Sequence, residues 1–156
     1  MFDRITKMGY TIKHVGGYFN CSNNNLTSLK GAPKSVGGSF NCYNNPNLTS
    51  LEHAPKSVGG SFNCSNNPNL TSLEHAPLKI GRDGDFNCRD NNLTSLEHAP
   101  KSVGRDFYCF NNPNLTSLKG APLKVGGDFS CGNNSKQFTI EEVKAVCDVK
   151  GNIYVY

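Results

Sequence analysis

Cysteine is the residue of this chain with the most versatile chemistry, and the seven cysteines could form disulfides or hold zinc. Six of them recur at intervals of 21 to 24 residues, at Cys21, Cys42, Cys64, Cys88, Cys109 and Cys131. No two have the C-x-x-C spacing of a zinc site, and an odd total argues against a disulfide framework. We therefore expect reduced thiols that serve as small apolar packing groups, as in a reducing compartment.

Histidine recurs in the same way, because three Glu-His pairs occupy equivalent positions at His53, His75 and His98. A row of imidazoles on neighbouring repeats could hold a metal ion, and this possibility stays open. The alternative is an exposed ladder of polar groups. Since the sequence offers no further ligand or orienting group, we predict no metal site and no cofactor.

Lysines form a further row, with Lys34, Lys56 and Lys101 directly after prolines and Lys79 and Lys124 one position later. Such a line of charge is typical of a solvated face, with an acidic partner as the alternative. The chain has no nucleophile–base pair, no phosphate-binding loop and no carboxylate pair outside the repeated positions. We therefore do not expect an enzyme.

The most informative residues vary between repeats while the framework stays constant. Large aromatic rings and arginine, which anchor protein interfaces, appear where other repeats carry serine, asparagine or glycine. The alternative explanation is sequence drift without function at exposed strand positions. The candidate partner-binding residues are Tyr18, Tyr43, Arg89, Tyr108, Phe110, Asp85 and Asp106.

These residues are carried by a repeat of 21 to 23 residues, which opens at Val15, Val36, Val58, Ile80, Val103 and Val125. A fixed period of this length predicts a solenoid, in which each repeat buries its apolar face against its neighbours. We expect a mainly β, single-domain β-solenoid of about six turns. A hydrophobic content of 36% suits so thin a body.

Each repeat contains Phe and Cys two residues apart, an arrangement that places both side chains on the inner face of a short strand. One such strand per repeat predicts a parallel sheet. The asparagine three residues after each cysteine is suited to satisfy backbone groups at a buried corner. The leucine pairs that follow, such as Leu48 and Leu51, return to the interior, and the Pro- and Gly-containing return segment favours extended backbone and turns.

The order F-x-C-x-x-N-x-L-x-x-L, seen directly in FNCSNNNLTSL and FNCRDNNLTSL, is similar to the leucine-rich-repeat pattern. The stretch LTSLEHAP resembles short bacterial effector-type leucine-rich repeats. The longer pattern LTSL-E/K-x-AP-x-x-VGG-x-F-x-C resembles the repeats of leucine-rich-repeat-like proteins of tailed phages. The resemblance covers about residues 9–134 and implies a recognition scaffold without a reaction. It also implies a phage product that engages a host component, such as a defence protein.

The two ends depart from the repeat, as solenoid caps do. We expect an N-terminal cap over residues 1–14, with Tyr10 and Ile12 covering the first repeat, then the solenoid over 15–137 and a C-terminal cap over 138–156. The segment Thr139–Glu142 has the form of a capping box, which predicts a helix from Ile140 to about Cys147. Alternation from Ile153 to Tyr156 predicts a final strand.

The sequence favours a binding protein that captures a protein partner through the outward strand face. The alternative is a self-associating structural or ligand-sequestering oligomer, so the oligomeric state stays open. A net charge of +4 without a basic cluster argues against nucleic acid. No apolar run approaches a membrane span, and the N-terminus lacks the apolar core of a secretory signal, so we expect a cytoplasmic protein, in the host cytoplasm if it is a phage product.

Overall fold

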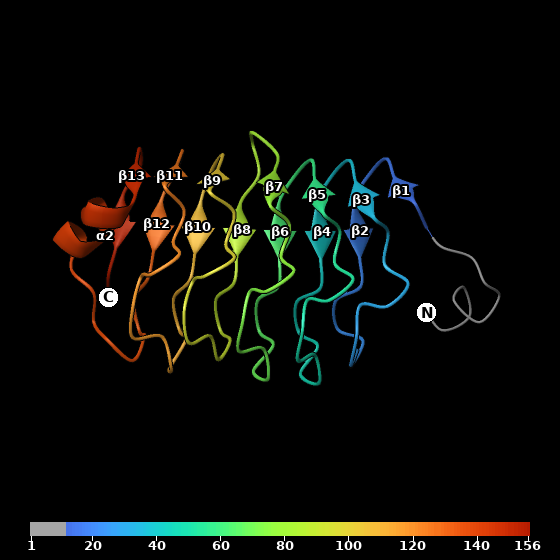
Figure 1. Cartoon of the computed structure of the whole chain (residues 1–156), viewed down its shortest axis with the longest axis horizontal. Coiled ribbons are helices and arrows are strands. Elements are labelled where there is room, and N and C mark those ends of the chain that lie inside the picture. The colour runs from blue at the N-terminus through green and yellow to red at the C-terminus, as the bar shows by residue number, and fades with distance from the viewer. Residues whose placement is uncertain (1–11) are drawn as a thin grey trace.

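The computed structural model describes residues 12–156, which wind into one elongated β-solenoid (Figure 1). Each repeat forms one coil, and we number coils 1 to 6 by their inward phenylalanines: Phe19, Phe40, Phe62, Phe86, Phe107 and Phe129. The predicted fold class is confirmed. Tyr10 and most of the predicted N-terminal cap lie outside the described residues, whereas the Ile12 carbonyl accepts the backbone N–H of Lys34 at 3.1 Å.

One parallel sheet runs along the whole solenoid and contains one two-residue strand from each coil. Its strands are β2 (Phe19–Asn20), β4 (Phe40–Asn41), β6 (Phe62–Asn63), β8 (Phe86–Asn87), β10 (Phe107–Tyr108), β12 (Phe129–Ser130) and β14 (Ile153–Tyr154). Phenylalanine pairs with phenylalanine throughout coils 1 to 6. Because the register is constant, equivalent side chains form straight rows along the solenoid.

The return segments also form strands, which the sequence predicted only as extended backbone and turns. One sheet contains β1 (His14–Val15), β3 (Ser35–Val36), β5 (Ser57–Val58) and β7 (Lys79–Ile80), and another contains β9 (Ser102–Val103), β11 (Lys124–Val125) and β13 (Asp148–Val149). The two are separate because coil 4 has two extra residues between Ile80 and Phe86. These residues lie in the loop that projects beyond β7 in Figure 1.

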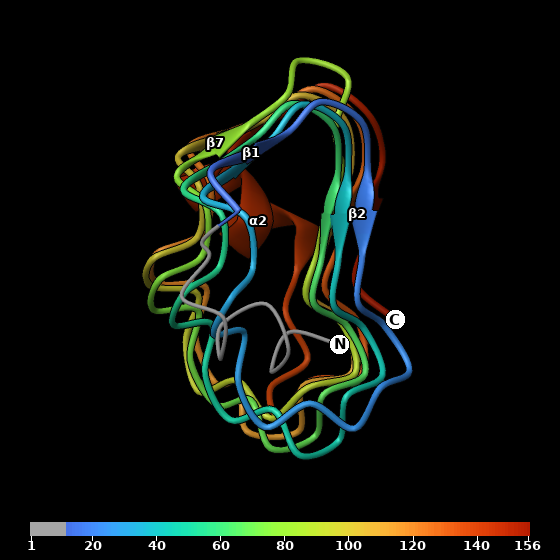
Figure 2. The same ribbon diagram turned by 90° about the vertical axis from the view of Figure 1, so that its right-hand side faces the viewer.

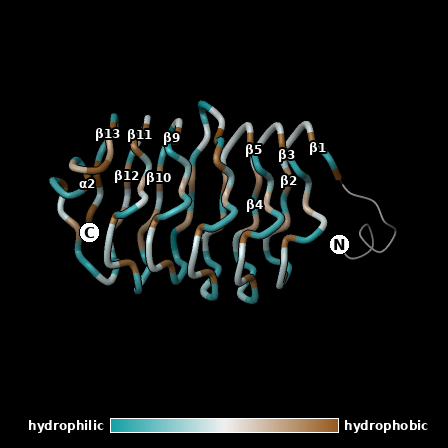
Figure 3. Tube along the Cα trace, in the orientation of Figure 1, coloured by the Kyte–Doolittle hydropathy of each residue, from teal (hydrophilic) through white to brown (hydrophobic). Residues whose placement is uncertain are grey.

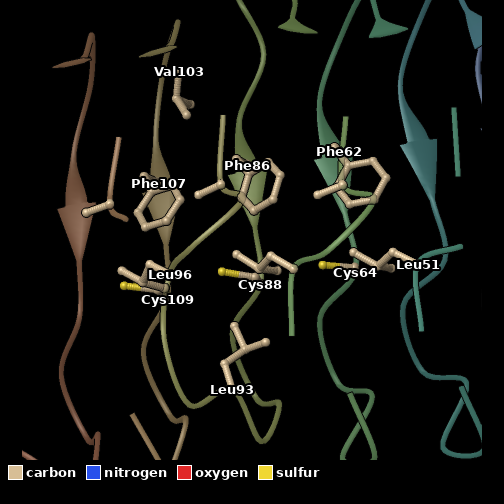
Figure 4. Packing of buried hydrophobic residues seen from close by; sticks show 14 of the residues in the cluster. Leu51, Phe62, Cys64, Phe86, Cys88, Leu93, Leu96, Val103, Phe107 and Cys109 are labelled. Carbon is tan, nitrogen blue, oxygen red and sulfur yellow. The ribbon is translucent and has the colours of Figure 1, made fainter. Parts of the chain in front are cut away.

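The core is built from stacked rows of identical side chains. Ring centroids of successive phenylalanines lie 5.1–5.7 Å apart from coil 1 to coil 6. Below the rings in Figure 4 lie the cysteine and leucine rows, and Figure 3 shows the same apolar segments recurring in each coil. All seven cysteines are buried and free, so the predicted inward position of the thiols is confirmed. Burial raises the pKa of the Cys64 thiol to about 12.

The corner after each strand is held by the predicted asparagines. The Asn67 amide donates to the carbonyls of Cys42 (3.3 Å) and Cys64 (2.8 Å), and its oxygen accepts the Asn45 N–H at 2.8 Å. One side chain thus satisfies backbone groups of two coils, as expected. The preceding residue in each coil, Asn66 for example, adopts a left-handed conformation on the surface.

In the C-terminal cap a helix takes the place of the leucine corner of coil 6, and strands β13 and β14 follow it. Helix α2 (Ile140–Val146) begins at Thr139, whose side chain accepts the Glu142 N–H while the Glu142 carboxylate accepts the Thr139 N–H. The predicted capping box and helix are therefore confirmed. Val143 of this helix is buried, and so is Phe138, which lies just before the helix in the sequence. Figure 2 shows α2 lying across the interior of the solenoid at this end.

Candidate functional site

The outward surface of the seven-stranded sheet, which we call the strand face, carries a cluster of aromatic and charged side chains on coils 4 and 5. The rings of Tyr108 and Phe110 meet edge to face, with centroids 6.4 Å apart and planes at 87°. The Arg89 guanidinium carbon lies 5.4 Å from the Phe110 centroid. These geometries are attractive because the positive edge of a ring, or a cation, meets the negative face of another ring.

The acidic residues of the strand face form a hydrogen-bonded ladder. Asp85 accepts the backbone N–H of Asp106 at 3.2 Å, and Asp106 accepts that of Asp128 at 2.8 Å. In coils 2 and 3 the hydroxyl oxygens of Ser39 and Ser61 likewise accept the backbone N–H groups of the equivalent residues in the next coil, Ser61 and Asp85. Each side chain therefore ties its coil to the next one, so Asp85 and Asp106 have a structural role.

The same ladder fixes the position of Tyr108. Its hydroxyl donates to Asp106 Oδ2 at 2.9 Å, while Asp85 lies 3.8 Å from the Arg105 guanidinium. Burial, followed by the hydrogen bond to Asp106 and the charge of that carboxylate, raises the pKa of Tyr108 to about 12. Tyr108 is therefore neutral and held in one orientation at ordinary pH.

The structure brings together five of the seven predicted binding residues, and we call them the strand-face cluster: Asp85, Arg89, Asp106, Tyr108 and Phe110. Tyr18 and Tyr43 belong to coils 1 and 2, beyond coil 3, which carries Ser61 and Ser65 at the positions equivalent to these two tyrosines. Tyr18 is 75% exposed. The seven candidate residues thus divide into one cluster and two separate tyrosines.

The position after each cysteine is less exposed than the sequence suggested. Ser22 and Ser65 are buried, which corrects the expectation that this position always faces solvent. The reason is local, because the side-chain oxygens of Asn20 and Asn63 accept the backbone N–H groups of these serines at 3.0 Å and so lie beside them. A residue as large as Phe110 or Arg89 extends beyond this recess and reaches the surface.

Tyr154 is a member of the strand face that the repeat pattern does not predict, because it lies beyond the last repeat. It pairs with Ser130 in the register of β12 and β14, so it continues the row that contains Tyr108. It is 42% exposed. The alternation of Ile153–Tyr156 predicted a strand. Only the pairing of Tyr154 with Ser130 shows which row of side chains Tyr154 extends.

A groove of about 550 Å³ lies beside the return strands, across the solenoid from the strand face. We call it the Glu-His groove, since the three Glu-His segments border it. His53, His75 and His98 line the groove, with Ala54 and Ala76 as buried side chains at its base. The residues equivalent to these histidines in coils 1 and 5 are Gly31 and Gly120, outside the groove.

The histidines of the groove have an unusual backbone. Their φ angles are 69–72°, in the left-handed region where a side chain costs about 1 kcal/mol relative to glycine. Gly31 and Gly120 have φ angles of 91° and 85°. Coils 1 and 5 therefore carry the residue that suits this conformation best, whereas the three coils at the groove carry imidazoles.

Charged side chains line the groove. Lys34 and Lys56 line it in adjacent coils, whose backbones are joined by a 3.0 Å hydrogen bond. Glu52 and Glu74 each lie 3.7 Å from the imidazole of the following histidine. Within residues 12–156 no group of three or more His, Cys, Asp and Glu side chains has the geometry to hold a metal ion.

The chain matches no protein-family model, no curated protein and no solved structure. Among the described residues, no helix has the length and apolar character needed to cross a bilayer. The fold defines the class of this protein, a repeat β-solenoid.

Proposed function

We propose that this protein is a non-enzymatic interaction module, related to leucine-rich repeats, that captures a protein partner through the strand-face cluster. The observation that carries the proposal is the contact set of Arg89, Tyr108 and Phe110, in which two aromatic rings and a guanidinium are held together on an exposed sheet. Aromatic residues and arginine dominate the energetics of protein interfaces.

The rigidity of the cluster supports this role. Tyr108 is fixed by Asp106, and Asp106 is fixed by the backbone of coil 6, so little side-chain freedom remains to be lost on binding. The fold needs neither ring at these positions, because coil 3 carries Asn63 and Ser65 there within the same sheet. A partner that packs against the rings explains why coil 5 differs.

The likeness of the repeats to those of tailed phages extends the proposal. A phage product of this kind would act in the host cytoplasm on a host protein, for example a component of defence. The sheet offers such a partner a surface of seven parallel strands. This is the general mode in which solenoids bind proteins, with variable residues carried on a constant framework.

The test compares proteins captured from a host lysate by the parent chain and by the double variant Tyr108→Asn/Phe110→Ser. This variant copies the residues of coil 3, so it should fold. We expect the captured partner to bind at least about thirtyfold more weakly, equivalent to about 2 kcal/mol. Leu123→Lys is the matched control, since it removes an exposed apolar side chain outside the strand face and copies Lys34 and Lys101.

The outcome that contradicts the proposal is a partner retained equally by the parent and the double variant. Loss of the partner in both the double variant and the Leu123→Lys control would also contradict it, because the loss would then not be specific to the cluster. Tyr18→Ser and Tyr43→Ser show whether the two separate tyrosines contribute, and we expect smaller losses from each.

Self-association is the second candidate function, and the C-terminal end favours it. Strands β13 and β14 are the last strands of their sheets, and Val146, Tyr154 and Tyr156 nearby are 39%, 42% and 85% exposed. Open strand edges beside apolar side chains are suited to pair with another chain. Light scattering decides between the candidates, because a monomer at all concentrations rules out the oligomer.

A further inference from the structure

The break between the two return sheets opens a groove of about 540 Å³, which we call the junction groove. The two extra residues of coil 4, Arg82 and Asp83, form the tip of a turn in which the Gly84 N–H donates to the Gly81 carbonyl at 3.0 Å. This turn is the loop that projects beyond β7 in Figure 1. Because coil 4 makes this detour, β7 and β9 do not pair, and the groove lies where the ladder of return strands is interrupted.

The charged side chains that line the junction groove are all cations. They are Lys79, Arg82, Lys101 and Lys124, and all four are exposed. No carboxylate lines the groove, and none of the four cations forms an ion pair with a residue between 12 and 156. The Glu-His groove differs in this respect, because glutamates line it beside its lysines.

The carboxylates nearest to these cations along the chain and across the sheet leave the positive charge in place. Asp83 stands at the exposed tip of the turn and is not among the residues that line the groove. Asp148, the pairing partner of Lys124, binds the Lys150 ammonium at 2.9 Å. The junction groove therefore attracts anions.

The cations belong to the segments that border the interruption. Strands β7 and β11 begin with Lys79 and Lys124, whereas β3, β5 and β9 have serine at this position: Ser35, Ser57 and Ser102. Arg82 belongs to the two-residue insertion of coil 4. The return strand is formed equally well with serine, so the framework does not require these lysines. A ligand in the groove accounts for their placement.

The interruption also leaves a backbone donor at the groove. In the continuous ladder, the Gly126 N–H donates to the Val103 carbonyl at 3.0 Å. The equivalent Gly104 lines the groove, and among the described residues its N–H has no such acceptor. The turn of coil 4 lies directly against this glycine, because a Cβ at Gly104 would stand 1.7 Å from the Arg82 carbonyl oxygen. This close approach holds the backbone of Arg82 at the groove.

We propose that the junction groove is a second binding site, which takes a small ligand bearing two or more phosphate groups. The guanidinium of Arg82 presents the forked donors that suit phosphate oxygens, and the lysine ammonium groups bind further oxygens as point charges. The N–H of Gly104 supplies a donor from the backbone. The site lies at the return strands and shares no residue with the strand-face cluster, so it goes beyond the proposed protein-binding function.

The size and the charge of the groove favour a compact polyphosphate. A volume of about 540 Å³ is in the range of small-molecule sites. Phosphate groups carry up to two negative charges each, whereas an extended peptide spaces the carboxylates on one of its faces about 7 Å apart. No aromatic side chain lines the groove, so the bases of a nucleic acid would have no ring on which to stack.

The test is isothermal titration calorimetry of the whole chain with inorganic tripolyphosphate, at neutral pH and constant low salt. We expect saturable binding at one site per chain. A hexaglutamate peptide and a hexathymidylate oligonucleotide are the competing anions, and each should bind at least tenfold more weakly. The strand-face variant Tyr108→Asn/Phe110→Ser should bind tripolyphosphate as the parent does, whether or not the proposed function is right.

Two lysine pairs locate the site. Lys79→Ser/Lys124→Ser copies Ser57 and Ser102, so it should fold, and we expect it to weaken binding at least tenfold. The matched control is Lys34→Leu/Lys56→Leu, which removes the same charge outside the junction groove and copies Leu78 and Leu123 at the equivalent positions. This control should bind within about twofold of the parent.

Deletion of residues 82–83 tests the groove itself without a change of net charge, because an arginine and an aspartate leave together. The deletion turns IGRDGDF of coil 4 into IGGDF, which corresponds to VGGDF of coil 6. We expect β7 and β9 to pair in this variant, so the groove closes and tripolyphosphate binding falls at least tenfold. Unfolding in urea verifies that the shortened chain is folded.

Each contrary result overturns the proposal. Equal losses in the two lysine pairs would indicate attraction by overall charge alone. Undiminished binding by the folded deletion variant would show that the groove plays no part. Tighter binding of the peptide or the oligonucleotide assigns the groove to that class of ligand, and an absence of saturable binding up to millimolar tripolyphosphate rules out the site.

Discussion

The guanidinium of Arg89 lies over the ring of Phe110, which belongs to the next coil, with 5.4 Å between the guanidinium carbon and the ring centroid. The two residues occupy equivalent positions after the cysteines of coils 4 and 5, so the constant register brings them together. Most other repeats carry serine or glycine at this position, so the contact joins the two unusual side chains of neighbouring repeats into one patch on the surface. It is the basis of the first prediction.

A double-mutant cycle with Arg89→Ser and Phe110→Ser should give a coupling energy of about 0.5–1 kcal/mol, the usual strength of a partly exposed cation–π contact. Serine stands at the equivalent Ser22 and Ser65, so both variants should fold. The free energies of unfolding of the four proteins in urea provide the measurement. Strict additivity would show that the contact contributes nothing to stability.

Asn67→Asp should destabilise the protein by about 3 kcal/mol or more. The substitution removes the donors to Cys42 and Cys64 and places a carboxylate among buried carbonyl groups. Asn66→Asp is the matched control on the exposed neighbouring row, and it copies Asp90, whose φ of 55° is the same. We expect it to change stability by less than about 0.5 kcal/mol, as measured by urea unfolding. Similar losses in both variants would contradict the role of the buried asparagine row.

Tyr108 should ionise near pH 12, and Asp106→Asn should lower this pKa toward the ordinary value of 10 without reaching it, because burial is the largest cause. The pKa is raised in the folded state, so neutral Tyr108 stabilises the fold below about pH 10, and this contribution is lost as the pH rises through 12. NMR titration of ring-labelled tyrosine measures both proteins. An ordinary pKa in the parent would contradict the bond to Asp106.

The cysteines should react slowly in the folded protein. Burial raises the pKa of Cys21 to about 12 and that of Cys147 to about 11, so thiolate is scarce at pH 8 and shielded from reagent. We expect all seven thiols to be labelled in denaturant and almost none in its absence, as counted by mass spectrometry. Rapid labelling of several repeat cysteines would be inconsistent with the buried row.

Removal of residues 138–156 should cost solubility as well as stability. The deletion takes away α2, β13 and β14, which exposes Phe129 and Cys131 and leaves the edge of β12 open. Thr139→Ala is a mild comparison that removes only the helix cap, at a cost of about 1 kcal/mol, and it should stay soluble. Size-exclusion chromatography compares the two. A truncated chain that remains monomeric and folds cooperatively would show that the segment is no cap.

The repeat made the framework predictable. In a solenoid, Phe and Cys at a spacing of two both point inward, and the asparagine three residues after the Cys bonds to the backbone of the corner. Phe62, Cys64 and Asn67 adopt these positions. The return strands were not predictable in the same way. Segments such as Ser57–Val58 are too short to show a period, and they become strands only because an equivalent segment lies on either side.

The sequence by itself determined the solenoid, the inward rows and the candidate residues of the strand face, because these depend on a pattern repeated within each coil. Only the tertiary structure decided which candidates meet. The register places Arg89 over Phe110 and leaves Tyr18 apart, and the left-handed backbone of His75 is a feature of the folded chain that the repeat pattern does not predict. The physical reason is that every lateral contact joins residues about one period apart, so neighbours on the surface are set by the stacking of coils.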